Sequence, residues 1–239
     1  AGSYKLVRSL CPSDKNIFEC ADLIFSNNYF NKDNIPTKPR NLGRIAINII
    51  AYNKPGYYPN ADKEKYEDYC SFIANIISYF VSKKDTEQIL LFTLHPEDDY
   101  ALEDIKKRVD SYQENKVIFS CKYTSFAQLH AALKGYDLIV SSRLHSLFLS
   151  ICLNKKVIPL IYQEKVQNFV YENNIDSISI DVQNLSPQSL YRFKSIFEKF
   201  EDNPFYYSSK IATSKEKCTI KSIKNFEFVK AKIISLKRK

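Results

Sequence analysis

Short apolar runs alternate with amphipathic segments along the chain from Gly43 onward. Apolar runs bounded by polar residues are typical of buried strands, and apolar residues at helical spacing are typical of helices that cover a sheet. The pattern predicts strands at Arg44–Ala51, Gln88–Leu94, Lys116–Ser120, Asp137–Val140, Lys156–Ile161 and Ser177–Ile180. The segments between them predict helices at Ala61–Ser82, Asp99–Tyr112, Ser125–Lys134, Arg143–Leu153, Val166–Glu172 and Pro187–Phe200.

This alternation predicts an α/β fold with a doubly wound, parallel, six-stranded sheet of the Rossmann-like kind. Strands that alternate with helices pair in parallel through right-handed crossovers, and near-continuous apolar strands fit a sheet covered on both faces. In the common strand order, 3-2-1-4-5-6, the fourth strand lies beside the first, and ligands bind outside the carboxyl ends of these two strands. We therefore expect Tyr52–Pro59 and Ser141–His145, which follow these strands, to line a binding crevice.

The two ends of the chain lie outside the alternation. Pro36, Pro39 and the polar run SNNYFNKDN predict a linker within residues 1–42, whereas residues 43–200 form the predicted sheet domain. For residues 201–239 we expect a basic, helical extension. The chain contains no methionine and opens with Ala-Gly-Ser, so we expect an incomplete sequence, either a fragment or a chain that lacks modified methionines.

The composition is that of a soluble globular protein, with 44% hydrophobic and 26% charged residues. No apolar run approaches the roughly 20 residues that a membrane-spanning helix needs, and no signal peptide is recognisable, so we expect a cytoplasmic protein. The net charge of +8 favours anionic partners. Much of this excess lies in the C-terminal VKAKIISLKRK, for which peripheral contact with anionic lipid at the inner face of the plasma membrane is a further expectation.

Several kinds of site are not predicted. The six cysteines show no CxxC spacing, so neither a zinc site nor a disulfide framework is expected, and no other metal site is indicated. The chain has no GxGxxG or GxxxxGK[ST] loop, and no RNA-binding signature. We therefore expect no resident cofactor and no nucleic-acid partner.

Arg143 and His145 carry the clearest chemical signal, because they fall in the first turn of the helix that follows the fourth strand. The unpaired amide hydrogens and the positive end of the helix dipole make such a turn an anion site. The always charged fork of Arg143 suits a two-pronged contact with an anion, and His145 has the chemistry of a proton donor. Lys165 follows the fifth strand and adds a point charge. The alternatives are an arginine paired with a neighbouring carboxylate, a core histidine and a solvated lysine.

Polar and aromatic residues after the first two strands are candidates for a second part of the site. His95, with Asp98 and Asp99, follows the second strand and has groups that bind a sugar hydroxyl or act as a base, although Asp99 also suits an ordinary helix start. Tyr52 and Tyr57 lie beside the predicted crevice and have rings on which a sugar could stack. Since the chain contains 17 tyrosines, position alone does not distinguish these two.

The chain resembles the polysaccharide pyruvyl transferase family over roughly residues 4 to 200. The resemblance rests on ADLIF, RIAINI, LFTLHPEDD and DLIVSSRLHSLFLSICLNKKVIPLIYQEKVQNF. The family marker is an Arg-Leu-His at a strand-to-helix turn, matched by Arg143, Leu144 and His145. It is followed by a strand with a proline and then Tyr-x-x-Lys, matched by Tyr162 and Lys165.

The resemblance implies one half of a glycosyltransferase-B-like enzyme that moves an enolpyruvyl unit from phosphoenolpyruvate onto two hydroxyls of a sugar, giving a pyruvate ketal. It implies that Arg143, Leu144, His145 and Lys165 bind the donor, with Arg143 and His145 catalytic. His95, Asp99, Tyr52 and Tyr57 are then candidates for binding the acceptor, a surface glycan under assembly or a lipid-linked oligosaccharide. Residues 1–42 become the remnant of an N-terminal domain plus a linker. If the chain is a fragment, it is expected to bind the donor but to have incomplete activity.

Two alternatives compete with this interpretation. A sugar-nucleotide-dependent glycosyltransferase of the same architecture would use the basic residues to hold a diphosphate. A non-catalytic anion-binding module would use the basic tail to dock on lipid or another anionic surface.

Overall fold

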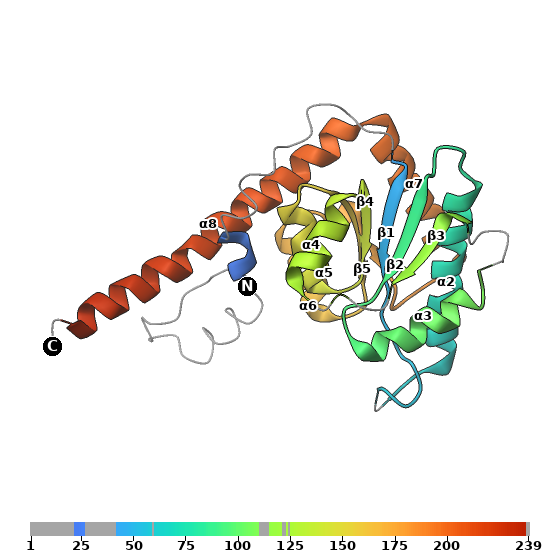
Figure 1. The fold of residues 1–239 in the computed structure, drawn as a ribbon, viewed down its shortest axis with the longest axis horizontal. Coiled ribbons are helices and arrows are strands. Elements are labelled where there is room, and N and C mark those ends of the chain that lie inside the picture. The colour runs from blue at the N-terminus through green and yellow to red at the C-terminus, as the bar shows by residue number, and fades with distance from the viewer. Residues whose placement is uncertain are drawn as a thin grey trace.

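The computed structural model describes residues 22–26, 42–58, 60–109, 115–120, 123 and 125–237 (Figure 1). The stretch 4–21 lies outside the described residues, and so does the predicted linker at SNNYFNKDN apart from its first residue, Ser26. Within the predicted sheet domain, the structure describes residues 43–58, 60–109, 115–120, 123 and 125–200.

The sheet is parallel and six-stranded, in the order β3-β2-β1-β4-β5-β6. Ile45 in β1 pairs with Ile89 in β2 on one side and with Leu138 in β4 on the other. This is the doubly wound, Rossmann-like order predicted from the sequence, and the fold class is confirmed. The strands are β1 (Arg44–Asn48), β2 (Gln88–Phe92), β3 (Val117–Ser120), β4 (Leu138–Ser141), β5 (Lys156–Ile161) and β6 (Ile180–Asp181).

Helices flank the sheet on both faces (Figure 1). Helices α3 and α7 both contact α2, whereas α5 contacts α8 and the short η1. The helical segments are η1 (Leu23–Ser26), α2 (Lys63–Ser82), η3 (Pro96–Asp98), α3 (Asp99–Lys106), α4 (Phe126–Lys134), α5 (Leu144–Cys152), α6 (Glu164–Glu172), η5 (Asp176–Ile178), α7 (Pro187–Asp202) and α8 (Pro204–Lys237).

The helix starts follow from side chains that accept the first free amide hydrogens. Asp62 caps α2 by accepting a hydrogen bond from the Lys65 N–H, 3.1 Å away, and Ser125 caps α4 in the same way through Gln128. Pro187 occupies the first turn of α7, where its missing N–H costs nothing. The predicted helices at these positions are therefore present. Helix α2 starts two residues and α4 one residue later than predicted, and α7 starts at the predicted Pro187.

Several predicted boundaries were wrong. Strands β1 and β2 end at Asn48 and Phe92, three and two residues before their predicted ends. The strand expected from Ser177 is a 3-10 turn followed by the two-residue β6. The helix expected to reach Tyr112 ends at Lys106, and residues 110–114 are not described. Arg143 is the extended residue before α5 rather than part of its first turn. The helix after β5 begins at Glu164, so Lys165 lies inside it.

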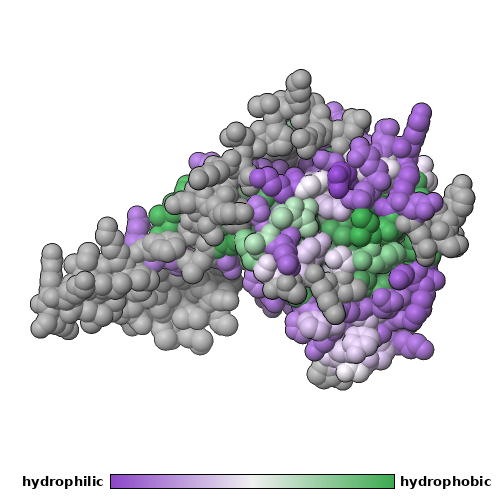
Figure 2. All heavy atoms as spheres, viewed as in Figure 1, coloured by the Kyte–Doolittle hydropathy of each residue, from purple (hydrophilic) through white to green (hydrophobic). Residues whose placement is uncertain are grey.

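The core lies between the sheet and its helices, and β1, β2, β4 and β5 are almost entirely buried. Aromatic rings fill the layer between α2 and α7, where Phe80 packs edge-on against Phe193 and Phe197 with ring centroids 5.7 and 5.0 Å apart. The surface seen in Figure 2 is mostly hydrophilic, with hydrophobic side chains gathered in the middle of the body. Such packing on both faces holds the strand ends in fixed positions.

Helix α8 extends well away from the sheet, and η1 lies against it (Figure 1). The Ser222 hydroxyl donates a hydrogen bond to the backbone oxygen of Asp22, and Lys215 donates one to the backbone oxygen of Cys152 in α5. The predicted C-terminal extension is thus largely helical, although the domain boundaries stay predictions. The side chains of Val229–Lys239 lie outside the description, so their expected contact with lipid stays a prediction too. None of the described helices is both long and apolar enough to cross a membrane.

Candidate anion site at the carboxyl ends of the strands

Asn48, the last residue of β1, connects three strand ends. Its side-chain oxygen accepts a hydrogen bond from the Arg143 backbone N–H, 2.9 Å away, and its side-chain nitrogen donates to the backbone oxygen of Phe92 in β2. The Ser142 hydroxyl donates to the backbone oxygen of Asn48 at 3.0 Å. Because Asn48 is fully buried, these bonds are shielded from water and hold the turn between β4 and α5 in place.

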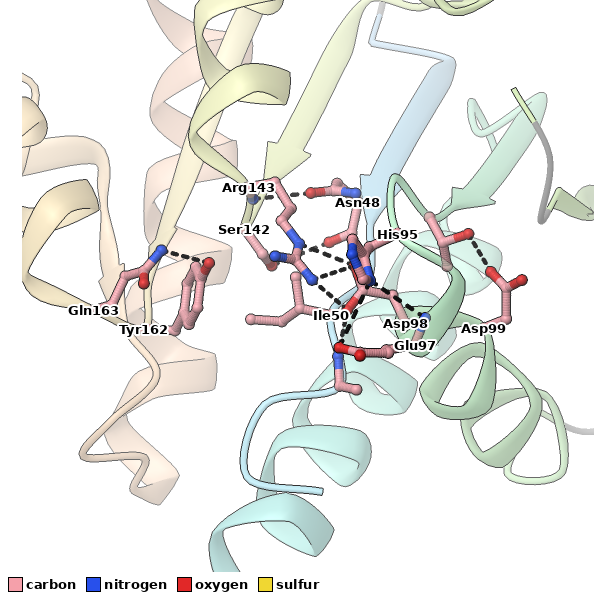
Figure 3. A network of polar contacts seen from close by, with 12 residues as sticks. Asn48, Ile50, His95, Glu97, Asp98, Asp99, Ser142, Arg143, Tyr162 and Gln163 are labelled. Carbon is pink, nitrogen blue, oxygen red and sulfur yellow. Dashed lines mark hydrogen bonds and ion pairs between the residues drawn. The ribbon is translucent and has the colours of Figure 1, made fainter. Parts of the chain in front are cut away.

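Arg143 and Asp98 form an ion pair at the centre of this edge (Figure 3). Arg143 Nε donates to Asp98 Oδ2 at 2.9 Å, and Nη2 donates to Oδ1 at 2.6 Å and to Oδ2 at 2.7 Å. The Asp98 side chain is 1% exposed, whereas that of Arg143 is 28% exposed. Arg143 therefore has the carboxylate partner of the alternative interpretation. Asp98 occupies one edge of its guanidinium through Nε and Nη2, and the Tyr162 phenol lies near the same side chain.

Two tyrosines lie in the electrostatic field of this ion pair. Burial disfavours the charge of Arg143, but its hydrogen bonds to Asp98 outweigh burial and raise the pKa of the guanidinium. Burial raises the pKa of Tyr58 and of Tyr162, and the positive charge of Arg143 opposes this rise in both. Both phenols consequently stay neutral at physiological pH. Gln163 donates a hydrogen bond to the Tyr162 oxygen (Figure 3).

His145 and Lys165 are exposed and lie at the starts of neighbouring helices. His145 is in the first turn of α5, where its ring meets Phe148 edge-on with centroids 6.2 Å apart. It is therefore not the buried histidine of the alternative interpretation. Lys165 is in the first turn of α6. Since β4 and β5 are adjacent and parallel, Arg143, His145 and Lys165 all stand at the carboxyl edge of the sheet.

The predicted second part of the site lies on the β1–β2 side of Arg143. His95 is about half exposed, begins η3 and contacts Glu97 at 3.6 Å, while Asp99 accepts a hydrogen bond from Thr93 at 2.5 Å and opens α3. These contacts fit an ordinary helix start. The predicted roles of His95 and Asp99 in binding an acceptor remain predictions.

Tyr52 and Tyr57 differ in their surroundings. Tyr52 is 7% exposed and packs edge-on against Tyr69 and Tyr162, and burial raises its pKa. Tyr57 packs against Tyr100 with ring centroids 5.3 Å apart, and hydrogen bonding between the two raises the pKa of Tyr57 to about 12. Tyr100 itself is 55% exposed. Of the two predicted tyrosines, Tyr57 is therefore partly exposed and paired with the exposed ring of Tyr100, whereas Tyr52 is buried.

Sequence reasoning missed the roles of Asn48 and Asp98 in holding Arg143. A signal for Asn48 was present, since it is the one strongly polar side chain in the apolar run IAINIIA and sits where a strand ends at the predicted crevice. Asp98 had no such signal, because it stands beside Glu97 and Asp99 and nothing local distinguishes the three acids.

Two further observations bear on other kinds of site. Among the described residues, no group of three or more histidine, cysteine, aspartate or glutamate side chains is placed to hold a metal ion. A hollow of about 160 Å³ lies at the opposite edge of the sheet, lined by Leu42, Lys83, Lys84, Asp85, Thr86, Phe197 and Glu201. Its Lys83 forms an ion pair with Glu201, 2.7 Å away.

The family model of the polysaccharide pyruvyl transferases matches residues 1–164 of the chain, which is more than half of its length. The chain belongs to this family. The matched region contains Asn48, Asp98, Arg143 and His145, and it ends one residue before Lys165. Family membership therefore covers both halves of the ion pair and the strand-to-helix turn that carries it.

Other comparisons add less. No curated protein matches the chain. A solved structure concerning EarP-mediated arginine glycosylation of translation elongation factor EF-P is similar, with 10% identity and a TM-score of 0.47 over 96% of this chain and 71% of that one. An alpha,alpha-trehalose 6-phosphate synthase from Burkholderia multivorans is similar with 8% identity and a TM-score of 0.46, over 82% of this chain and 45% of that one. Similarities this low carry no information on substrate or activity.

Proposed function

We propose that the protein is a pyruvyltransferase that moves an enolpyruvyl unit from phosphoenolpyruvate to two hydroxyls of a sugar in the synthesis of a capsule, exopolysaccharide or other surface glycan. The observation that carries the proposal is the coincidence of family and geometry. The chain belongs to the polysaccharide pyruvyl transferase family, and Arg143 and His145 stand at the start of α5 on the carboxyl edge of the sheet.

The donor in this proposal binds between the starts of α5 and α6. Phosphoenolpyruvate carries a phosphate and a carboxylate, so its site needs at least two groups that bind anions. The first amides of α5, beginning at Leu144, accept one anion with the help of the helix dipole. Arg143 supplies Nη1 to the same anion, and Lys165 supplies a second positive charge from the neighbouring helix. Arg143 thus makes a one-sided contact with the donor, because Asp98 holds its other side.

The proposed reaction adds both sugar hydroxyls to the same carbon of the donor. The first hydroxyl adds to C2 of phosphoenolpyruvate while the methylene carbon gains a proton and becomes a methyl group. The C–O bond to phosphate then breaks, and the second hydroxyl adds to the resulting cation and passes its proton to the departing phosphate. One ketal and one inorganic phosphate form from one donor and two hydroxyls. His145, exposed beside the anion site, is the proposed proton donor to the methylene carbon, and it recovers a proton from the first hydroxyl as that hydroxyl adds to C2.

The acceptor sugar in this proposal occupies the β1–β2 side of Arg143. The partly exposed pair of Tyr57 and Tyr100 offers aromatic surface for the apolar face of a sugar ring, and His95 offers a hydrogen-bonding group on the same side of Arg143. Arg143 lies between this pair and the donor groups, because Tyr57 follows β1, Tyr100 follows β2, and both strands lie on the side of β4 away from β5. The reacting hydroxyls would then approach the donor across the guanidinium.

A thermal-shift series tests the class of donor, because a ligand raises the melting temperature only of a protein that binds it. We expect phosphoenolpyruvate to raise the melting temperature, and uridine and guanosine diphosphate sugars to leave it unchanged. Inorganic phosphate controls for general anion binding and should act only at much higher concentration. Stabilisation by nucleotide sugars alone would instead support a glycosyltransferase, and no stabilisation by any of these ligands would contradict donor binding altogether.

A further inference from the structure

We infer that Asp98 is the positioning residue of the site, which holds Arg143 with its Nη1 edge toward the ligand. The effect of Asp98 on donor affinity rests on the proposed function, whereas its effect on the arginine side chain does not. Neither the family match nor the sequence pattern singles out Asp98 from the acids beside it.

The contacts of Asp98 are those of a fixed support. Its carboxylate accepts hydrogen bonds from Arg143 Nε and Nη2 and also from the Ala51 backbone N–H, 3.0 Å away. Ala51 follows β1, Asp98 follows β2 and Arg143 follows β4, so one carboxylate joins the ends of three strands. With its side chain 1% exposed, Asp98 has no room to leave this position without opening the core.

Arg143 is held from its backbone as well as from its side chain. Asn48 receives the backbone N–H of Arg143, and Asp98 receives Nε and Nη2. A long arginine side chain normally loses several rotatable degrees of freedom when it binds a ligand. In this protein the Arg143 side chain has already lost that freedom before a ligand binds. The entropic cost of ordering it therefore does not reduce the affinity.

A carboxylate beside an anion site has a second, opposite effect, which makes the inference easy to contradict. The negative charge of Asp98 repels an anionic ligand, so neutralising it would strengthen binding if charge alone mattered. If positioning dominates, the neutral variant instead binds more weakly. The sign of the change in affinity therefore shows whether Asp98 mainly positions Arg143 or mainly repels the ligand.

The first experiment observes the Arg143 side chain in the ligand-free protein. The chain contains seven arginines, so Arg143→Ala assigns the Nε–H signal of Arg143 in a nitrogen–proton NMR spectrum. We expect this proton to exchange slowly with water and to lose that protection in Asp98→Asn, which keeps the shape of the side chain. Asp104→Asn is the matched control, because Asp104 pairs with Lys54 and not with Arg143. Unchanged protection in Asp98→Asn, with the backbone spectrum preserved, would overturn the inference.

The second experiment is a double-mutant cycle on affinity for phosphoenolpyruvate, measured by calorimetry on the full chain. We expect Asp98→Asn to weaken binding by about tenfold when Arg143 is present and to have no further effect in the Arg143→Ala background. Tighter binding by Asp98→Asn, or an equal loss in both backgrounds, would overturn the positioning role. If the unmodified protein binds no phosphoenolpyruvate, the proposed function fails, and the NMR experiment alone decides the inference.

Discussion

The Asn48 side chain accepts the backbone N–H of Arg143 at 2.9 Å, although the two residues are 95 positions apart in the chain. This bond joins the end of β1 to the turn after β4, the place where the strand order of the sheet reverses. The position of Arg143 therefore depends on a buried amide that has no contact with solvent. Stability and ligand binding are expected to be coupled at this residue.

Asn48→Ala should lower both the stability of the fold and the affinity for the donor. The substitution leaves the Arg143 N–H without its acceptor, removes the donor to Phe92, and should lower the free energy of unfolding by about 1–3 kcal/mol. Urea denaturation measures this loss, and calorimetry with phosphoenolpyruvate measures the expected weakening of affinity. Asn184→Ala is the control, because Asn184 is exposed and bonds Asp181 at the far end of the sheet. Stability equal to that of the unmodified protein would show that the buried amide does not support the turn.

His145→Gln should separate catalysis from binding. His145 is exposed, and its only ring contact among the described residues is with Phe148, so the change should leave the fold intact. Loss of a proton donor lowers turnover by about 10²–10⁴-fold, whereas donor affinity should change little because glutamine keeps a hydrogen-bonding group. Phosphate release and the new ketal methyl signal in proton NMR measure the rate. Turnover that survives the substitution would assign proton transfer to another group.

Tyr57→Ala should raise the KM for the acceptor and leave the KM for phosphoenolpyruvate unchanged. Tyr57 and Tyr100 form the partly exposed aromatic pair on the β1–β2 side, away from the proposed donor groups. Tyr191→Ala, which removes a ring 76% exposed on α7, controls for the loss of surface aromatic area. A change in the donor KM alone would place the donor, and not the acceptor, against Tyr57.

Asp104 gives a prediction on pH and stability. Burial alone would raise its pKa, but hydrogen bonds from Lys54, Tyr66 and Lys107 outweigh this effect and lower the pKa below its usual range. Above the usual carboxylate pKa of about 4, Asp104 is ionised in both states and its stabilisation is complete. As the pH falls further, the unfolded chain takes up a proton first, and the stabilisation is lost progressively.

The stability lost in Asp104→Asn should therefore be largest near neutral pH and shrink below about pH 4. Urea midpoints measured from pH 7 downward follow this change. Asp68→Asn, at an exposed position on α2, controls for the removal of one negative charge. A loss in Asp104→Asn that is the same at every pH would mean that the stabilisation does not come from the ionised carboxylate.

The sheet was predictable because its strands are continuous apolar runs, and six such runs separated by helices allow few arrangements. The place of Arg143 followed from that order. The partner of Arg143 did not, since Asp98 lies 45 residues away and meets it only after β2 and β4 have taken their places on either side of β1. Strand β6 was overestimated because Ser177 and Ile178 satisfy their backbone in a 3-10 turn, which an apolar alternation over four residues does not reveal.

A crystal soaked with phosphoenolpyruvate tests the central claim most directly, namely that the carboxyl edge around Arg143 binds a small, doubly charged anion. The account predicts density for the phosphate or the carboxylate within hydrogen-bonding distance of Arg143 Nη1 and the first amides of α5, with Asp98 still bound to the other side of the guanidinium. Density in the hollow beside Lys83 and Lys84, with an empty site at Arg143, would contradict it.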